Sequence, residues 1–137
     1  MPISVYTDGS SKGNPGPGGW GVHINKNGEI YEFCGRDYDT TNNKMELKAT
    51  IEALNFFKQP EKLDLYTDSA YVLNGITKWI KGWKKNGWKN SKKETVKNKE
   101  LWKKLDFYNS KHDVNWIKVK AHSGDPGNER ADHLATF

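Results

Sequence analysis

The sequence contains a single cysteine, Cys34, and no run of apolar residues long enough to cross a membrane. One cysteine excludes an internal disulfide, and with it the small secreted domains that disulfides stabilise. The first residues show neither a secretory leader nor an arginine-rich transit segment. We therefore expect a cytoplasmic protein with no membrane partner, in which Cys34 is a half-buried residue at the end of a strand.

Internal repeats and flexible linkers are also absent. A chain of 137 residues without such divisions is expected to form one domain, residues 1–137, with a sizeable core. The net charge of +5 favours an anionic partner, although bulk charge alone is a weak signal.

Acidic residues are scarce between residues 78 and 104, where eleven lysines stand against only Glu94 and Glu100. This segment carries a charge of +9, which leaves −4 for the rest of the chain. Trp79 and Trp83 lie four residues apart, so they share one face of a predicted helix. Lysines interleaved with aromatic residues suit a phosphate backbone and sugar edges. The alternative is a solvated lysine face over buried tryptophans.

The tripeptide Tyr-Thr-Asp occurs twice, at residues 6–8 and 66–68, each time after a short apolar run. Both copies predict a β-strand that ends on a carboxylate. If the strands are parallel neighbours, Asp8 and Asp68 converge at the carboxyl edge of the sheet, where open α/β sheets bind their ligands. Two close carboxylates repel unless a proton or a cation lies between them. The repeat therefore favours a metal site.

Two further acids and one histidine have suitable contexts. Glu46 lies in the first turns of a predicted helix, on a side made small by the residues that follow it. Asp132 lies in a short helix near the end of the sequence, and His122 lies in the glycine-containing loop before that helix. Taken singly, each has an ordinary interpretation: a strand-end aspartate as a turn or cap residue, Glu46 as a first-turn acid, Asp132 as a solvated helix residue and His122 as a loop residue.

The hydrophobic periodicity predicts an α/β fold. Strands are expected at residues 3–8, 19–25, 29–34, 63–67 and 114–119, and helices at residues 43–58, 70–88 in one or two pieces, 97–109 and 127–135. Asn27 and Gly28 form a favourable tight turn between the second and third strands, and Asn42 or Asn43 can cap the first helix. Strands that alternate with helices after an opening meander indicate a mixed sheet.

The order of several short motifs resembles the type 1 ribonuclease H family, and the resemblance covers essentially the whole chain. The motifs lie at residues 7–10, 13–19, 41–43, 45–46, 67–69, 75–77, 83–89, 122–124, 127–129 and 131–132. Each is weak alone, but in this order they are highly specific. The resemblance implies a ribonuclease H-like fold, with a five-stranded mixed sheet of order 3-2-1-4-5 flanked by helices. It also places Asp8 and Asp68 on adjacent central strands.

The resemblance implies an endoribonuclease that hydrolyses the RNA strand of RNA–DNA hybrids, leaving 3′-hydroxyl and 5′-phosphate ends. Asp8, Glu46, Asp68 and Asp132 would hold two divalent metal ions, which activate the attacking water and stabilise the leaving 3′-oxygen. Oxygen ligands without cysteine suit Mg²⁺, with Mn²⁺ as a substitute. His122 matches the family's mobile-loop histidine, which assists proton transfer or product departure.

Substrate contacts follow from the same resemblance. A turn at Gly9, Ser10 and Ser11 would approach a ribose, and the 2′-hydroxyl distinguishes RNA from DNA. The remaining implied contacts are Asn14, Asn42 and Asn43 in the minor groove, Thr41 and Asn98 at a DNA phosphate, and Trp79, Trp83, Lys84, Lys85 and Ser91 in a basic protrusion at about residues 78–97.

Several features leave alternatives open. Asp39 stands where some relatives have an arginine, and Ala70 where many have a longer polar side chain, so both departures weaken the implied substrate grip. A short final helix would hold Asp132 poorly. A related DNA nuclease or polynucleotidyl transferase, a catalytically weak hybrid-binding module and a reverse-transcriptase domain are the other interpretations. We expect a monomer.

Overall fold

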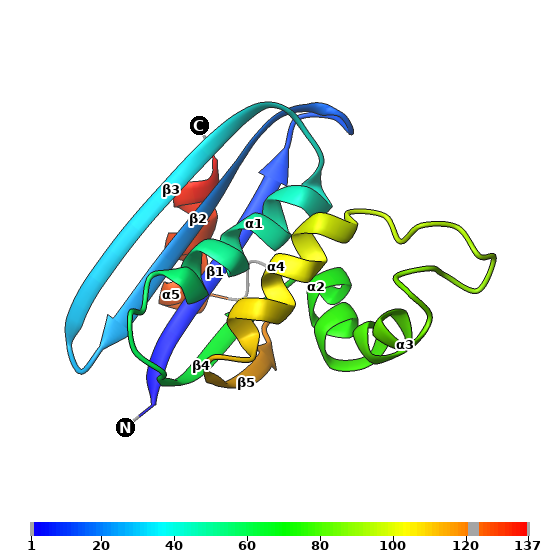
Figure 1. The fold of residues 1–137 in the computed structure, drawn as a ribbon. Coiled ribbons are helices and arrows are strands. Elements are labelled where there is room, and N and C mark those ends of the chain that lie inside the picture. Colours follow the sequence, from blue (N-terminus) through cyan, green and yellow to red (C-terminus); the bar gives the residue numbers. More distant parts are fainter. Residues whose placement is uncertain (1, 121–123, 137) are drawn as a thin grey trace.

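The protein is described by a computed structural model, which covers residues 2–120 and 124–136. Its five-stranded sheet has the order β3-β2-β1-β4-β5 (Figure 1). The strands are β1 (Ile3–Ser11), β2 (Gly16–Lys26), β3 (Glu29–Thr40), β4 (Lys62–Thr67) and β5 (Asp113–Lys118). β1, β2 and β3 are joined antiparallel, whereas β1 pairs with β4, and β4 with β5, in parallel. The expected mixed sheet and its strand order are confirmed.

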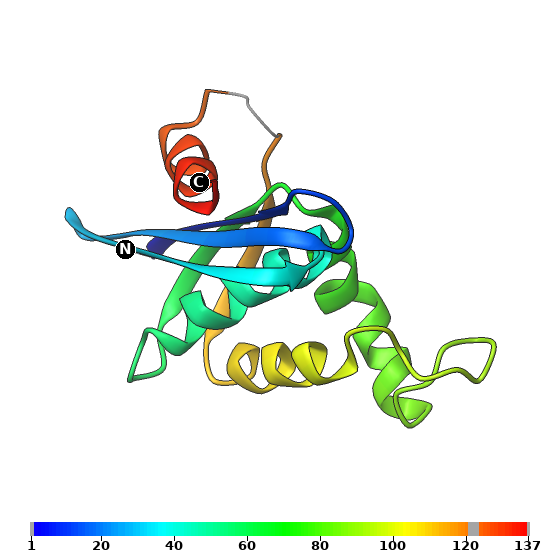
Figure 2. The same ribbon diagram turned by 90° about the horizontal axis from the view of Figure 1, so that it is seen from above.

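The helices divide between the two faces of this sheet. They are α1 (Asn42–Asn55), α2 (Ala70–Asn74), the π-helix η1 (Gly75–Trp79), α3 (Ile80–Lys85), α4 (Lys99–Asn109) and α5 (Pro126–Ala135). Figure 2 shows α5 on one face, with α1 and α4 on the other. None of the helices in the described residues is long and apolar enough to cross a membrane.

The hydrophobic core lies between the sheet and α1, with α4 behind α1. Alternate residues of β1 face this core, so Val5 is buried while Tyr6 points to the α5 face. Leu47 and Ile51 of α1 and Leu105 of α4 are buried, as their helical spacing predicts. Burial of these apolar faces is the main force that holds α1 and the central strands in a fixed relation.

The hairpin between β2 and β3 has the predicted turn but is longer than expected. Asn27 and Gly28 both have positive φ, 53° and 91°, as a tight two-residue turn requires. β3 continues past Cys34 because its antiparallel pairing with β2 extends to Thr40. Cys34 therefore lies inside an edge strand, and it is exposed rather than half-buried.

The junction of β1, β2 and α1 also differs from expectation. Gly9, Ser10 and Ser11 extend β1 instead of forming a turn, because they pair with Trp20, Gly19 and Gly18 of β2. The cap of α1 is Thr41, whose hydroxyl accepts a hydrogen bond from the Lys44 backbone N–H at 3.2 Å. The prediction of Asn42 or Asn43 as the cap was wrong, since both lie inside the helix.

Candidate active site

Asp8 lies on β1, and Asp68 directly follows the neighbouring parallel strand β4. β1 and β4 are in register, with Tyr6 opposite Tyr66, so the aspartate two residues beyond each tyrosine occupies an equivalent place. The two tyrosine rings stack with their centroids 4.5 Å apart on the α5 face. The repeated tripeptide thus brings two carboxylates together at the carboxyl edge of the sheet, as the sequence predicts.

Glu46 reaches the same place from α1 because β1 and α1 approach each other very closely at Gly9. A Cβ atom added to Gly9 would lie 2.3 Å from the Met45 carbonyl carbon and 2.4 Å from the Glu46 nitrogen. Only glycine leaves room for this contact between backbones. Glu46 Oε1 is buried and has no hydrogen-bond partner among the described residues.

Asp8, Glu46 and Asp68 form one carboxylate cluster, with an oxygen atom from each lying within 4.8 Å of those of the other two. Burial, followed by the negative charge of Asp68 and a hydrogen bond with Asp132, raises the pKa of Asp8 to about 8. Burial and the charges of Asp8 and Asp68 likewise raise the pKa of Glu46 well above its ordinary value. At neutral pH such a cluster requires protons or cations to offset its charge.

Asp132 approaches this carboxylate cluster from α5, on the side of Asp8. The first turn of α5 is well defined: Pro126 occupies the first helical position, and Asp125 accepts a hydrogen bond from the Gly127 N–H at 3.0 Å. Asp132 is not one of the three residues whose oxygens lie within 4.8 Å of one another. Its contact is with Asp8, through the hydrogen bond that helps to raise the Asp8 pKa. His122 lies outside the described residues.

A second polar group lies beside the carboxylates, where β1 ends and α1 begins. Asn42 Oδ1 accepts a hydrogen bond from the Ser11 backbone N–H at 2.6 Å. The Asn42 backbone N–H in turn donates to Asn14 Oδ1 at 3.0 Å, and the Ser11 hydroxyl donates to the same Asn14 oxygen at 3.1 Å. Asn14 and Asn42 are exposed, so this Ser11–Asn14–Asn42 group is a fixed polar surface that a ligand can reach.

Known proteins match this chain over almost its whole length. A family model described as RNase H matches residues 2–137. A ribonuclease H from Hyphomonas neptunium is 55% identical over 133 residues, which cover 97% of this chain and 89% of that protein. A ribonuclease HI from Brucella melitensis is 55% identical over 97% of this chain and 86% of its own length. The chain belongs to the ribonuclease H family.

Solved ribonuclease H structures share this fold. LC9-RNase H1, a type 1 RNase H with the type 2 active-site motif, superposes with a TM-score of 0.84 at 33% identity, over 97% of this chain and 69% of that one. LC11-RNase H1, whose structure was determined in complex with an RNA/DNA hybrid, superposes with a TM-score of 0.73 at 26% identity, over 97% and 93%. These matches confirm the resemblance on which the sequence interpretation rests.

Thr41 and Asn98 each precede the first residue of a helix. Thr41 caps α1, and Asn98 precedes α4 in the left-handed conformation, with φ of 61°. The Asn98 side-chain amide donates a hydrogen bond to the Tyr71 hydroxyl at 3.1 Å, and the Trp102 indole N–H donates to the same oxygen at 3.1 Å. Tyr71 therefore orients Asn98, a role that sequence patterns could not indicate because the residues lie 27 apart.

The basic protrusion, residues 78–97, leaves the body of the molecule at α3 (Figure 1). Trp79 is 42% exposed, whereas Trp83 is partly buried and packs edge-on against Trp102 at 5.2 Å. Lys85 and Ser91 are exposed. Lys84 is engaged in an ion pair, since its Nζ lies 3.0 Å from Asp106 of α4. Lys84 thus ties the protrusion to the body of the molecule.

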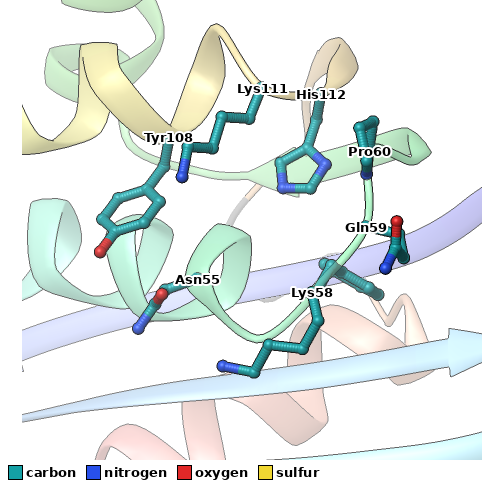
Figure 3. A pocket seen from close by; sticks show the side chains of 8 residues that line it. Asn55, Lys58, Gln59, Pro60, Tyr108, Lys111 and His112 are labelled. Carbon is teal, nitrogen blue, oxygen red and sulfur yellow. The ribbon is translucent and has the colours of Figure 1, made fainter.

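A separate cavity of about 380 Å³ lies at the opposite end of β4 and β5 (Figure 3). It is lined by Lys58, Lys111, His112 and their neighbours. Both His112 ring nitrogens are occupied: Nδ1 accepts from the Glu61 backbone N–H at 3.0 Å, and Nε2 donates to the Leu54 carbonyl at 3.1 Å. This histidine therefore joins the end of α1 to the start of β4 and is not available for catalysis.

Proposed function

We propose that this chain is an endoribonuclease that hydrolyses the RNA strand of RNA–DNA hybrids, leaving 3′-hydroxyl and 5′-phosphate ends. The observation that carries the proposal is the carboxylate cluster of Asp8, Glu46 and Asp68 at the carboxyl edge of the sheet. Membership of the ribonuclease H family and the likeness to a hybrid-bound ribonuclease H structure support it.

The chemistry of the cluster fits divalent metal ions. Three carboxylates lie within 4.8 Å of one another, and one buried Glu46 oxygen has no protein donor within the described residues. Hard cations prefer such all-oxygen sites, and Mg²⁺, with Mn²⁺ as a substitute, is the ion that we propose. Two bound ions would supply Lewis acidity for the attacking water and for the leaving 3′-oxygen.

Within this proposal the carboxylates have distinct tasks. Asp8, Glu46 and Asp68 hold the ions, and their positions are set by two parallel strands and by the contact of α1 with Gly9. Asp132 completes the set from α5 beside Asp8. His122 is proposed to assist proton transfer or product departure. Bound cations would offset the burial that raises the pKa of Asp8 and of Glu46, and the protons of these two carboxyl groups would pass to solvent.

Recognition of RNA is assigned to the surface beside the carboxylates. The Ser11–Asn14–Asn42 group presents amide and hydroxyl groups at fixed positions, and a ribose 2′-hydroxyl can both donate to and accept from such groups. Gly9, Ser10 and Asn43 adjoin this surface along β1 and the first turn of α1. A deoxyribose lacks the hydroxyl and would leave these groups without a partner.

The DNA strand is assigned to the other side of the site. Thr41 and Asn98 would hold one phosphate, with Asn98 oriented by Tyr71. Trp79, Trp83 and the exposed Lys85 and Ser91 would line the backbone along the protrusion. Lys84 contributes by positioning the protrusion, because its ammonium group is paired with Asp106.

The deciding experiment compares cleavage of end-labelled duplexes of one sequence in four reactions: RNA–DNA, RNA–RNA, DNA–DNA, and RNA–DNA with EDTA. We expect Mg²⁺-dependent cutting of the RNA strand in the hybrid only. Cutting of DNA would move the chain to the related nucleases and transferases. An absence of cutting with tight, salt-sensitive hybrid binding would indicate a binding module instead.

A further inference from the structure

Asp132 is carried by a helix that has few neighbours. In the described part of the chain, α5 is the only helix on its face of the sheet, and it packs against β1, β2 and β3 (Figure 2). It has only 10 residues. Its position on the sheet, and therefore the reach of the Asp132 carboxylate, depends on contacts with these strands.

The central contact between α5 and the sheet is made by small residues. A Cβ atom at Gly21 would lie 2.6 Å from the Ala131 carbonyl oxygen, and one at Gly19 would lie 2.5 Å from that of Ala135. Such close packing sets the height of the helix above β2. The Leu134 side chain lies against Gly21, and the Tyr6 ring of β1 lies against Gly127 of α5, so packing also restrains the helix.

Polar bonds from the sheet add to this packing: Arg36 of β3 donates to the Thr136 carbonyl at the end of α5 at 3.0 Å, and a second anchor on β2 and β3 holds the helix beside Asp132. His23 and Glu32 are directly opposite each other in the antiparallel pair, and His23 Nδ1 lies 2.7 Å from Glu32 Oε2. The same Glu32 oxygen accepts a hydrogen bond from Arg130 Nε of α5, also at 2.7 Å. The Glu32 side chain is only 24% exposed, and that of His23 only 17%. Glu32 is thus held between a strand and the helix.

The anchor and the catalytic carboxylate lie on opposite flanks of α5. Successive residues of an α-helix turn by about 100°, so Arg130 and Asp132, two residues apart, point about 200° apart. A rotation of the helix that lengthens the Arg130–Glu32 contact would therefore move the Asp132 carboxylate relative to Asp8.

We infer that Glu32, held by His23 and bonded to Arg130, is a positioning residue that sets the rotation of α5 and so the place of Asp132 in the metal site. The inference rests on the proposed function. A hydrogen bond from Arg130 also keeps the pKa of Glu32 below its ordinary value, so the carboxylate is charged at neutral pH. Neither Glu32 nor Arg130 contacts the ions or the hybrid in this assignment.

The test measures metal affinity as well as activity. In Glu32→Gln and in Arg130→Ala, the Mg²⁺ concentration for half-maximal cleavage should rise about threefold to tenfold, since outer contacts of metal sites act on affinity. The KM for the hybrid at saturating Mg²⁺ should not change. Calorimetric titration of Mn²⁺ into the free protein should show the same loss of affinity without any substrate.

Two controls separate positioning from general stability. Glu61→Gln removes a comparable carboxylate from an ion pair with Lys26, 3.6 Å long, that does not involve α5, and it should leave the Mg²⁺ requirement unchanged. The double variant Glu32→Arg with Arg130→Glu exchanges the two charged side chains. It should recover most of the metal affinity that the single variants lose. Melting temperatures should differ little among all variants, because ion pairs at the protein surface, where Arg130 is 45% exposed, add little to global stability.

An unchanged Mn²⁺ affinity in both single variants would overturn the inference. So would variants in which the KM for the hybrid rises while the Mg²⁺ concentration for half-maximal cleavage stays the same. A wild-type protein that binds Mn²⁺ but cuts no hybrid would refute the proposed function alone. The calorimetric comparison would still decide whether Glu32 positions Asp132.

Discussion

Among single residues, Asp8 has a strongly altered environment, because it is buried with Glu46 and Asp68 close to it and with a hydrogen bond to Asp132. Its raised pKa, about 8, records both its burial and the surrounding negative charge. A residue in this position is costly to ionise without a cation. This cost is consistent with the proposed role of Asp8 in holding a metal ion.

The first residue-scale prediction concerns catalysis. Asp8→Asn or Asp68→Asn keeps the size of the side chain but removes a charged metal ligand, so hybrid cleavage should fall below detection. Binding of the hybrid should change little, since the Ser11–Asn14–Asn42 group and the protrusion remain. Cleavage rates and filter binding at the same Mg²⁺ concentration test this. A variant that cleaves normally, or that loses binding as severely as turnover, would contradict the assignment.

The second residue-scale prediction concerns pH. Asp8 has a pKa of about 8 in the folded chain, raised from 3.8, so the folded state binds more protons than the unfolded state between these values. In EDTA, stability should therefore fall as pH rises from about 4 to 8. Mg²⁺ should raise the melting temperature more at pH 8 than at pH 5.

The matched control for this titration is Asp8→Asn, which cannot ionise at that position. Its melting temperature in EDTA should fall less steeply between pH 5 and pH 8 than that of the wild type. Identical slopes in the two proteins would show that the Asp8 carboxyl does not cause the pH dependence.

At the scale of elements, the site depends on how closely α1 approaches β1. Gly9 permits this contact, and Glu46 reaches Asp8 only because the two backbones nearly touch. A second glycine permits a similarly close contact in the π-helix η1, which leads into the protrusion. This π-helix separates α2 from α3 at Gly75, where the Trp102 ring packs so closely that a Cβ atom would lie 2.0 Å from it. In both places a glycine allows two elements to meet.

The element-scale prediction is that Gly9→Ala separates α1 from β1. Overpacking of this kind costs about 1–3 kcal/mol of folding free energy, and the Mg²⁺ requirement should rise because Glu46 moves away from Asp8. Thermal melts and Mg²⁺ titrations measure the two effects. Gly82→Ala, in α3 with nothing within 4 Å of its added Cβ, should be neutral or slightly stabilising. Equal effects of both substitutions would refute the close-contact argument.

At the scale of the whole molecule, charge is divided between two regions. The segment from 78 to 104 carries +9 and the remainder −4, and the carboxylate cluster belongs to the latter. In the proposed function, the positive protrusion would bring a hybrid to a site that would otherwise repel it. Divalent cations at the carboxylates would remove the remaining repulsion.

The molecule-scale prediction separates binding from turnover. Removing Trp79 and Lys85 together by alanine substitution should raise the hybrid KM several-fold and leave kcat nearly unchanged, because both are exposed and distant from the carboxylates along the chain. The salt dependence of binding should become shallower. Lys58→Ala, which removes an equal charge beside the distant cavity (Figure 3), is the control. A similar KM increase in Lys58→Ala would indicate a non-specific charge effect.

The residue patterns predicted the mixed sheet and most of its helices, because alternation and turn chemistry act over short distances. The strand order, and with it the placing of Asp8 and Asp68 on adjacent strands, came from the resemblance to the family. The predictions from sequence were wrong where two local patterns favour different structures for the same residues. Thr41 rather than Asn42 caps α1, since the asparagine side chain bonds Ser11 instead. β3 extends beyond its apolar pattern because its backbone pairing with β2 continues to Thr40.

The sequence by itself predicted the helices and strands, the family, and the acidic residues that are candidates for the site. Each of these predictions depends on residues that are neighbours along the chain. Only the tertiary structure decided how these acids are held. The bond from Arg130 to Glu32 joins residues 98 positions apart, and Tyr71 meets Asn98 across another long separation. No local pattern encodes such contacts, because they exist only after the sheet has formed and the helices have packed on its two faces.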